Sequence, residues 1–279
     1  MRFNLPVLVY QEKNCVHNHA DEIAQMGKNA LIVTGRNSSK KNGSLDDVIN
    51  ALKSKNIKYT VYDGVEENPS VETVMEAREI GVKAGCDFII GIGGGSPMDA
   101  AKAIGVMIYH KNENKDFLYK SVSNSQSLPV IEVPTTCGTG SEVTTVAVLT
   151  VHNEKTKKSM SHRIFPRMAL VDEKYIKNAP LKVICDTAID ALAHIVESCI
   201  NNNATEYSKM FAKEGLEAWS KFKDVLLGNR EATDEDFHNM MYASTLAGMC
   251  IAHAGTSLPH GLSYPITYEL GISHGKAVG

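Results

Sequence analysis

The chain has 279 residues, of which 43% are hydrophobic and 22% are charged, a composition typical of a globular protein rather than a fibrous or disordered one. Its 29 basic and 32 acidic residues nearly balance at a net charge of −3, which argues against a nucleic-acid partner. We expect no signal peptide and no membrane span, since Ser96, Pro97, Asp99 and Lys102 interrupt the longest apolar stretch. Six separated cysteines without a CxxC pair predict reduced thiols and a cytoplasmic location.

Short β-branched runs alternate with longer amphipathic stretches between residues 29 and 172, which predicts an α/β domain with a mostly parallel sheet. The expected strands are 30–34, 58–62, 88–92, 130–133 and 169–171, and the expected helices are 45–55, 71–84 and 99–109. Beyond residue 180 only helical spacing remains, at 183–200, 204–227 and 234–253. We therefore expect an α/β domain over residues 1–179 and an all-α domain over residues 180–279.

Two glycine-bearing loops follow expected strands. In the first loop, Gly93, Gly94, Gly95 and Ser96 lead into a helix, where small side chains let backbone N–H groups approach a phosphate. The dinucleotide fingerprint GxGxxG is only half matched, because Ser96 stands where a glycine is required. The second loop, 134–142, carries the hydroxyls of Thr135, Thr136 and Thr139. Each loop alone could be a plain turn, but together they favour a nucleotide site at the carboxyl edge of the sheet.

One carboxylate and three imidazoles form a candidate metal site. Asp190 and His194 share a helix face at spacing i, i+4, and His260 and His274 each precede a glycine in apolar surroundings. This donor set suits Fe²⁺ or Zn²⁺ better than Ca²⁺ or Mg²⁺. A surface hydrogen bond between Asp190 and His194 is the alternative. We interpret His253 as a core histidine, and we expect the other histidines at the surface: His17, His19, His110, His152, His162 and His238.

The segments 93–102, 134–142 and 190–194, followed by the two His-Gly pairs, together resemble the iron-containing, or group III, alcohol dehydrogenase family over essentially the whole chain. The resemblance implies a dinucleotide-binding domain followed by a helical metal-binding domain. It also implies hydride transfer between a small alcohol, or its aldehyde or ketone, and NAD(P), assisted by Fe²⁺ or alternatively Zn²⁺. The implied metal ligands are Asp190, His194, His260 and His274, and the implied cofactor contacts are Gly93, Gly94, Gly95, Ser96, Asp99, Thr135, Thr136 and Thr139.

The chain departs from the family pattern at several points. Gly35 and Arg36 stand where many NAD-dependent members carry an aspartate against the adenosine ribose, and with Ser38 they favour NADP slightly over NAD, unless this is only a solvated basic loop. Tyr264 replaces a histidine of many members, so Tyr264 and His253 are our candidates for proton transfer and for shaping the pocket. A Phe-Gly-x-Gly motif is absent around residues 9–11. Members also continue further, which implies that this chain is C-terminally incomplete.

Two other functions remain open at this point. One is a polyol dehydrogenase similar to the zinc-dependent glycerol dehydrogenases of the same superfamily. The other is a non-catalytic remnant that binds nucleotide and metal. For either enzyme we expect a homodimer or a higher homo-oligomer, the usual state of such folds, with no membrane partner.

Overall fold

The computed structural model describes residues 3–279 and is built on a six-stranded sheet. Its strands are β1 (Leu8–Gln11), β2 (Asn29–Gly35), β3 (Lys58–Val65), β4 (Phe88–Gly93), β5 (Val130–Pro134) and β8 (Met168–Val171). They lie in the order β1-β8-β5-β4-β2-β3, and every neighbouring pair is parallel. The sheet that the sequence predicts is therefore confirmed, with β1 as an added edge strand.

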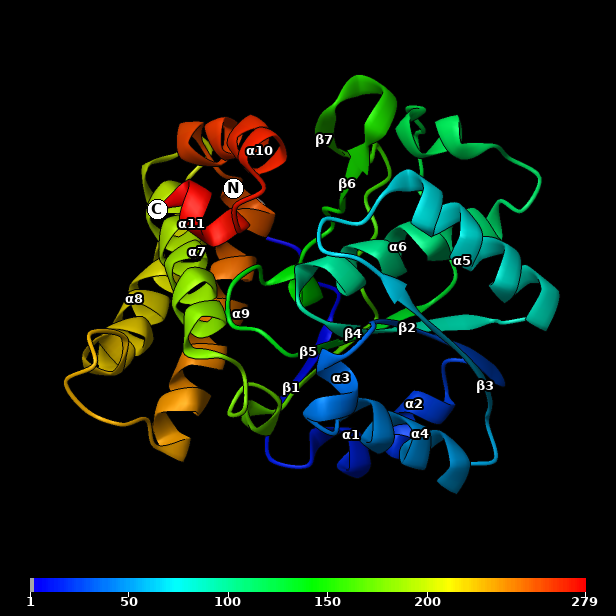
Figure 1. Cartoon of the computed structure of the whole chain (residues 1–279), viewed down its shortest axis with the longest axis horizontal. Coiled ribbons are helices and arrows are strands. Elements are labelled where there is room, and N and C mark those ends of the chain that lie inside the picture. Colours follow the sequence, from blue (N-terminus) through cyan, green and yellow to red (C-terminus); the bar gives the residue numbers. More distant parts are fainter. Residues whose placement is uncertain (1–2) are drawn as a thin grey trace.

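Helices cover both faces of this sheet (Figure 1). On one face lie α5 (Val71–Ala84) and α6 (Gly95–Tyr109); on the other lie α1 (Cys15–Asn18), α2 (Ala20–Ala24), α3 (Ser38–Lys41) and α4 (Ser44–Ser54). Every residue of β4 is buried, as expected for a central strand covered on both sides. α5 begins where the Ser70 hydroxyl accepts the Thr73 N–H and ends at Gly85 in the left-handed conformation, which glycine adopts readily.

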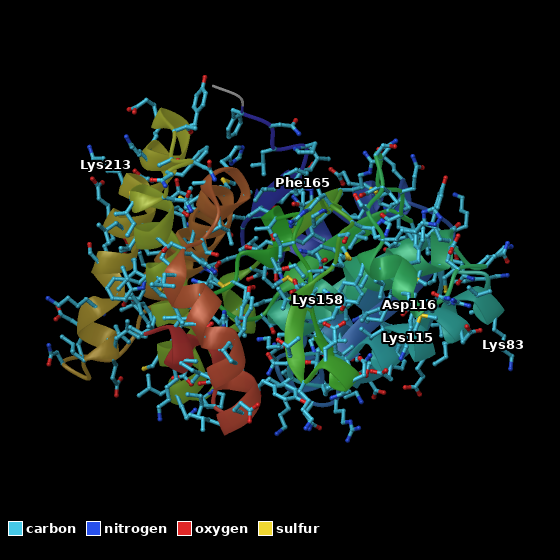
Figure 2. All side chains as sticks on the ribbon, turned by 90° about the horizontal axis from the view of Figure 1, so that it is seen from above. Lys83, Lys115, Asp116, Lys158, Phe165 and Lys213 are labelled. Carbon is cyan, nitrogen blue, oxygen red and sulfur yellow. The ribbon has the colours of Figure 1, made fainter. Side chains whose placement is uncertain are left out.

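The second part of the chain is helical. It contains α7 (Leu181–Ile200), α8 (Glu206–Leu226), α9 (Asp234–Ala254), α10 (Leu258–Leu270) and α11 (His274–Val278). Capping boxes at Thr205 and Thr233 begin α8 and α9. In Figure 2, Lys213 on α8 and Lys83 on α5 mark the two opposite ends of the molecule. This arrangement confirms the expected fold class, and in the described part of the chain no helix is long and apolar enough to cross a membrane.

Several elements are absent from the sequence prediction. They are β1, the short helices α1, α2 and α3, the helices α10 and α11, the hairpin of β6 (Val148–Val151) and β7 (Thr156–Ser159), and four short 3₁₀ helices, η1 (Lys115–Tyr119), η2 (Ser141–Val143), η3 (His152–Glu154) and η4 (Glu173–Tyr175). α10 escapes prediction because Gly261 and Pro265 both lie inside it, and both residues have low helix propensity. Tertiary packing, rather than local helix propensity, therefore accounts for the helical conformation of α10.

His162 corrects one expectation. The sequence predicts a surface histidine, but this side chain is fully buried, and its Nε2 lies 2.8 Å from the carbonyl oxygen of Phe117 in η1. The ring centroid lies 4.7 Å from that of Phe117. The polar residues around His162 in the sequence predict exposure. In the structure, the chain that follows β7 packs the His162 ring against Phe117 of η1, a contact that depends on the tertiary fold.

The two parts of the molecule meet in direct backbone contact. Gly140, at a φ of 58°, leads into η2 and packs against Gly248 of α9. A Cβ on Gly140 would lie 2.6 Å from the Gly248 nitrogen and 2.9 Å from the carbonyl oxygen of Ser244, so only glycine fits. Lys102 of α6, itself fully buried, donates to the carbonyl oxygens of Ser141 and Val146 at 2.8 Å. The loop around Gly140 and Ser141 is therefore in contact with α9 on one side and bonded to Lys102 of α6 on the other.

An unusual carboxyl group lies inside the sheet. Glu132, in the middle of β5, is fully buried, and neither of its carboxyl oxygens has a hydrogen-bond partner among residues 3–279. Burial raises its pKa well above the usual range, although the nearby Lys102 ammonium acts in the opposite direction. As pH rises, the Glu132 carboxyl therefore keeps its proton in the folded protein to a higher pH than in the unfolded chain.

We expect the free energy of unfolding to fall less steeply with rising pH in Glu132→Gln than in the wild type. A raised pKa in the folded state gives stability below the unfolded pKa, which is lost as pH rises through the folded pKa, at about 1.4 kcal/mol per pH unit. Denaturant unfolding between pH 5 and pH 8 should show a smaller decline for Glu132→Gln than for the wild type. The matched change Glu217→Gln, at an exposed position on α8, should leave the decline unaltered; equal slopes for all three proteins would contradict a protonated Glu132.

Candidate metal centre and cofactor site

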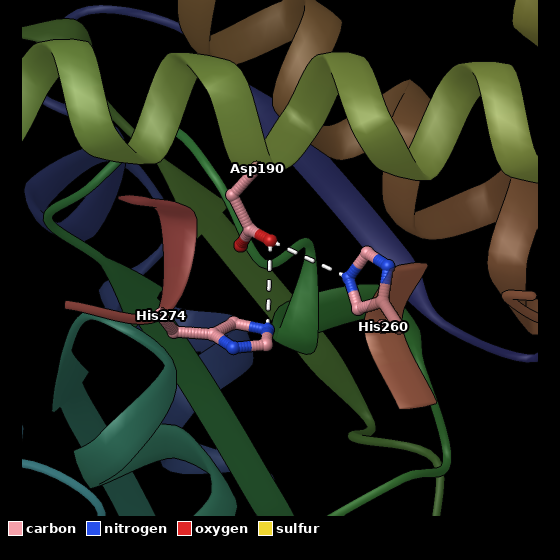
Figure 3. A group of neighbouring side chains, drawn as sticks. All are labelled: Asp190, His260 and His274. Atoms are coloured by element: carbon pink, nitrogen blue, oxygen red, sulfur yellow. Dashed lines mark ion pairs between the residues drawn. The ribbon is translucent and has the colours of Figure 1, made fainter. Parts of the chain in front are cut away.

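Asp190 is the centre of a cluster that three helices build. Its Oδ1 lies 3.9 Å from Nε2 of His194, one turn further along α7. The same oxygen lies 3.4 Å from Nε2 of His260 on α10 and 3.6 Å from Nε2 of His274 on α11. Figure 3 shows Asp190 pointing from α7 into the space between the two imidazoles from the neighbouring helices. Ligand atoms of Asp190, His260 and His274 all lie within 4.8 Å of one another, a span suited to one ion.

The His194 ring lies beside this group, although it is not one of the three residues whose ligand atoms all lie within 4.8 Å of one another. It stacks on the His260 ring with centroids 4.4 Å apart, and its Nδ1 lies 3.2 Å from the carbonyl oxygen of Gly138. A hydrogen bond at Nδ1 places the proton there and leaves the Nε2 lone pair facing Asp190. Because Gly138 belongs to the second glycine-bearing loop, this contact also ties the cluster to that loop.

The burial of the cluster tests whether a cation fits it. Asp190, His194 and His260 are buried, yet Asp190 Oδ1 and His260 Nε2 have no hydrogen-bond partner within residues 3–279. Such polar atoms are costly to bury unless something binds them. One carboxylate oxygen and three imidazole nitrogens suit a divalent ion such as Fe²⁺ or Zn²⁺. The residues present therefore fit a divalent cation.

The protonation states also suit a cation. Burial opposes ionisation of Asp190, but its histidine neighbours outweigh burial and hold its pKa below the usual range. Burial lowers the pKa of His194, and it lowers that of His274 to about 4. Burial would also lower the pKa of His260, but its contacts with Asp190 and Glu197 raise it. Near neutral pH the cluster therefore offers an ionised carboxylate and two neutral imidazoles.

The first glycine turn lies against the second loop. β4 ends at Gly93, where φ is 151° and a Cβ would lie 2.6 Å from Cγ of Pro97. A Cβ on Gly95 would lie 2.7 Å from Cγ2 of Thr139, and one on Gly94 would lie 3.0 Å from Oγ1 of Thr136. The structure therefore brings the glycines together with these two hydroxyls. Thr135 is close as well, because its N–H donates to the Gly93 carbonyl oxygen at 2.8 Å.

Two residues expected in the cofactor site make internal contacts. The Ser96 hydroxyl accepts the Asn68 N–H at 3.0 Å. Asp99 accepts the Ser141 hydroxyl at 2.6 Å and the Val148 N–H at 2.8 Å, so both its carboxylate oxygens are engaged. Through these bonds Asp99 connects α6 to η2 and β6, so in this structure its carboxylate stabilises the arrangement of these elements.

The loop after β2 places Arg36 and Ser38 at the surface, beside the half-buried Gly35. Lys40 of α3 pairs with Asp63 at 2.5 Å, and the pKa of Asp63 is lowered by Lys40 with a further contribution from Arg36. The Lys40 ammonium is thus compensated by a carboxylate, whereas Arg36 and Ser38 remain accessible to a phosphate.

Tyr264 and His253 lie in different surroundings. The Tyr264 ring is 5.9 Å from the His274 ring, and burial, with the charges of Asp99 and Asp190, raises its pKa to about 12. The His253 ring instead stacks on Phe3 at 4.6 Å. The Nδ1 of His253 lies 2.8 Å from the Met249 carbonyl oxygen, and its Nε2 lies 3.3 Å from the Asn4 nitrogen. Of the two residues, only Tyr264 lies beside the imidazole cluster. Both ring nitrogens of His253 contact backbone atoms, of Met249 and Asn4.

Sequence reasoning missed two charged residues near the cluster. Lys157 on β7 has its Nζ 5.4 Å from the Tyr264 ring centroid, and burial lowers its pKa while Asp99 and Asp190 act in the opposite direction. Glu197 on α7 contacts His260. Glu197 carries a sequence signal, because it follows Asp190 by seven residues and so shares its helix face. Lys157 carries none, because the hairpin that bears it was not predicted.

The glycine turn on a parallel sheet and the imidazole cluster on a helical part together define an architecture of an α/β part followed by an all-α part. Family comparison is more specific. The model described as iron-containing alcohol dehydrogenase matches residues 6–173, and the C-terminal model of the Fe-containing alcohol dehydrogenase family matches residues 184–279. The chain belongs to the iron-containing alcohol dehydrogenase family, which confirms the resemblance seen in its sequence.

Known relatives extend beyond the matched region. A solved iron-containing alcohol dehydrogenase from Thermotoga maritima has a TM-score of 0.94 and 41% identity, covering 99% of this chain and 76% of that one. The long-chain primary alcohol dehydrogenase of Thermoanaerobacter ethanolicus is 32% identical over 90% of this chain and 63% of its own length. The NADPH-dependent butanol dehydrogenase of Clostridium saccharobutylicum is 32% identical over 99% of this chain and 71% of its own length. The chain thus spans 63% and 71% of these two curated relatives.

Proposed function

We propose that the protein interconverts a small alcohol and its aldehyde or ketone by hydride exchange with NAD(P), assisted by Fe²⁺ or alternatively Zn²⁺. The supporting observation is the 3.2 Å contact between His194 Nδ1 and the Gly138 carbonyl oxygen. This contact joins the imidazole cluster to the loop whose Thr139 packs on Gly95 of the glycine turn. A cation and a dinucleotide bound at these two places would be neighbours, as direct hydride transfer requires.

Asp190, His194, His260 and His274 would hold the cation. When bound, it supplies Lewis acidity that polarises the substrate oxygen and lowers the pKa of an alcohol. The N-terminus of α6, where the first N–H groups lack intrahelical acceptors and the helix dipole is positive, favours the pyrophosphate. Gly93, Gly94 and Gly95 let Pro97, Thr136 and Thr139 pack closely against this turn. Thr136 and Thr139 supply hydroxyls beside this turn.

Tyr264 acts in this proposal as a hydrogen-bonding residue beside the imidazole cluster. Before a cation binds, burial and the charges of Asp99 and Asp190 raise its pKa to about 12, so its Oη carries a proton near neutral pH. The proton released by an alcohol leaves through water, a cofactor hydroxyl or Tyr264. The hydroxyl of Tyr264 can still donate a hydrogen bond to a substrate oxygen.

The proposed activity is tested by removing the metal and restoring it. Protein freed of metal by a chelator should oxidise neither NADPH nor NADH, followed at 340 nm, in the presence of a short aldehyde. Anaerobic Fe²⁺, or Zn²⁺, should restore the rate. A panel that includes glycerol and other polyols separates an alcohol dehydrogenase from a polyol dehydrogenase. Metal-independent turnover, or cation and NADPH binding without turnover of any alcohol, polyol or aldehyde, would overturn the proposal.

We propose a preference for NADPH over NADH, and Arg36→Ala should reduce it. A charged hydrogen bond to the 2′-phosphate contributes about 1.5–3 kcal/mol, so the ratio of kcat/KM for NADPH to that for NADH should fall about 10- to 100-fold. The rate with NADH should change little, because NADH lacks that phosphate. Lys53→Ala, at an exposed position of α4, is the control for a general loss of positive charge. An unchanged ratio in Arg36→Ala would place the 2′-phosphate elsewhere.

A further inference from the structure

Glu197 is a buried carboxylate that stands behind the imidazole cluster. It lies on α7, with 3% of its surface exposed, seven residues after Asp190. Its Oε1 lies 2.6 Å from Nδ1 of His260, while Nε2 of the same ring points to Asp190 at 3.4 Å. The imidazole is therefore held between two carboxylates from one helix, one at each ring nitrogen.

The other oxygen of Glu197 holds the helix that carries His260. Its Oε2 accepts the backbone N–H of Ser257 at 2.5 Å and the Ser257 hydroxyl at 2.9 Å. Ser257 precedes α10, so Glu197 satisfies a donor at the start of that helix that lacks an intrahelical acceptor. One side chain thus sets both where α10 begins and how the His260 ring is turned.

We propose that Glu197 is a positioning residue of the metal centre, which fixes the tautomer and orientation of His260 for cation binding. This inference rests on the proposed function. With the proton held on Nδ1 by the carboxylate, Nε2 presents its lone pair toward Asp190. The negative charge behind the ring also strengthens its donor nitrogen, an effect by which partners of ligating histidines raise metal affinity. Glu197 itself contacts the histidine and not the cation.

Glu197→Gln is the first variant, because glutamine keeps the shape and removes the charge. The affinity of the chelator-treated protein for Co²⁺ or Zn²⁺, measured by competition with a chromogenic chelator, should fall about 10- to 100-fold. The visible absorption of bound Co²⁺ should also change, because it reports the arrangement of the ligands. A role confined to holding α10 would lower the Tm of the metal-free protein but leave affinity and spectrum unaltered. Glu217→Gln on α8 is the matched control and should change none of these quantities.

A second measurement uses the unmodified chain and does not depend on the folding of a variant. Nitrogen-15 NMR of the histidine rings with Zn²⁺ bound should show His260 protonated at Nδ1 and coordinating through Nε2. Coordination through Nδ1, or wild-type affinity in a folded Glu197→Gln protein, would overturn the inference and leave the proposed function standing. A wild-type chain that binds neither cation would overturn the proposed function and this inference together.

Discussion

Asp190→Asn should remove the divalent cation and the turnover together. Oδ1 of Asp190 lies within 3.9 Å of Nε2 on each of His194, His260 and His274, so it is the atom common to the whole cluster. Asparagine keeps the volume but removes the charge that balances a cation in this buried site. A bound metal contributes several kcal/mol of transition-state stabilisation, so kcat/KM should fall by about 1,000-fold or more.

Metal content by mass spectrometry and initial rates at 340 nm measure this result together. Asp234→Asn is the control, because that carboxylate is 61% exposed at the surface, where it pairs with Lys13 and Lys177. It should keep both the metal and the rate of the wild type. If Asp190→Asn retained full metal content and full activity, the assignment of the metal ligands would be wrong.

The second large effect is expected from Gly275→Ala. Gly275 follows His274 in α11, and a Cβ there would fall on the backbone carbonyl of Asp186 in α7. A helix backbone cannot yield as a flexible side chain can, so α11 must move away and carry His274 with it. Movement of one ligand by about 1 Å can cost about 100-fold in rate, and we expect at least that loss of kcat/KM, together with weaker metal binding.

Gly261→Ala is the matched control for this change. Gly261 also follows a histidine of the cluster, His260, and also lies in a helix, but a Cβ there meets nothing within 4 Å. Alanine should therefore leave metal binding intact and raise stability by about 0.5–1 kcal/mol, measured as the free energy of unfolding. Equal behaviour of the two variants would show that α11 does not depend on its close approach to α7.

The first half of the fold was predictable because its signals are local. The central strands, such as β4, are continuous apolar runs, and α5 is bounded by Ser70 and Gly85, so its predicted limits agree with the structure. The hairpin of β6 and β7 was missed because its strand Thr156–Ser159 is short, polar and half exposed. β1 was also not predicted, because it forms a strand by pairing with β8, which lies far from it in the sequence.

The sequence by itself determined the chemistry that this protein can offer: a strand–glycine–helix turn, a loop of hydroxyls, and a helix face carrying Asp190 and His194. Residue types and helical spacing are local properties, so they can be read without a fold. The resemblance to the family already implied that His260 and His274 are metal ligands together with Asp190, and the structure places them beside it. Only the tertiary structure decided that Tyr264 lies beside His274 while His253 packs on Phe3, and that Glu197 contacts His260. These contacts connect helices through side-chain packing and backbone approach, and such long-range contacts leave no periodic signal in the chain.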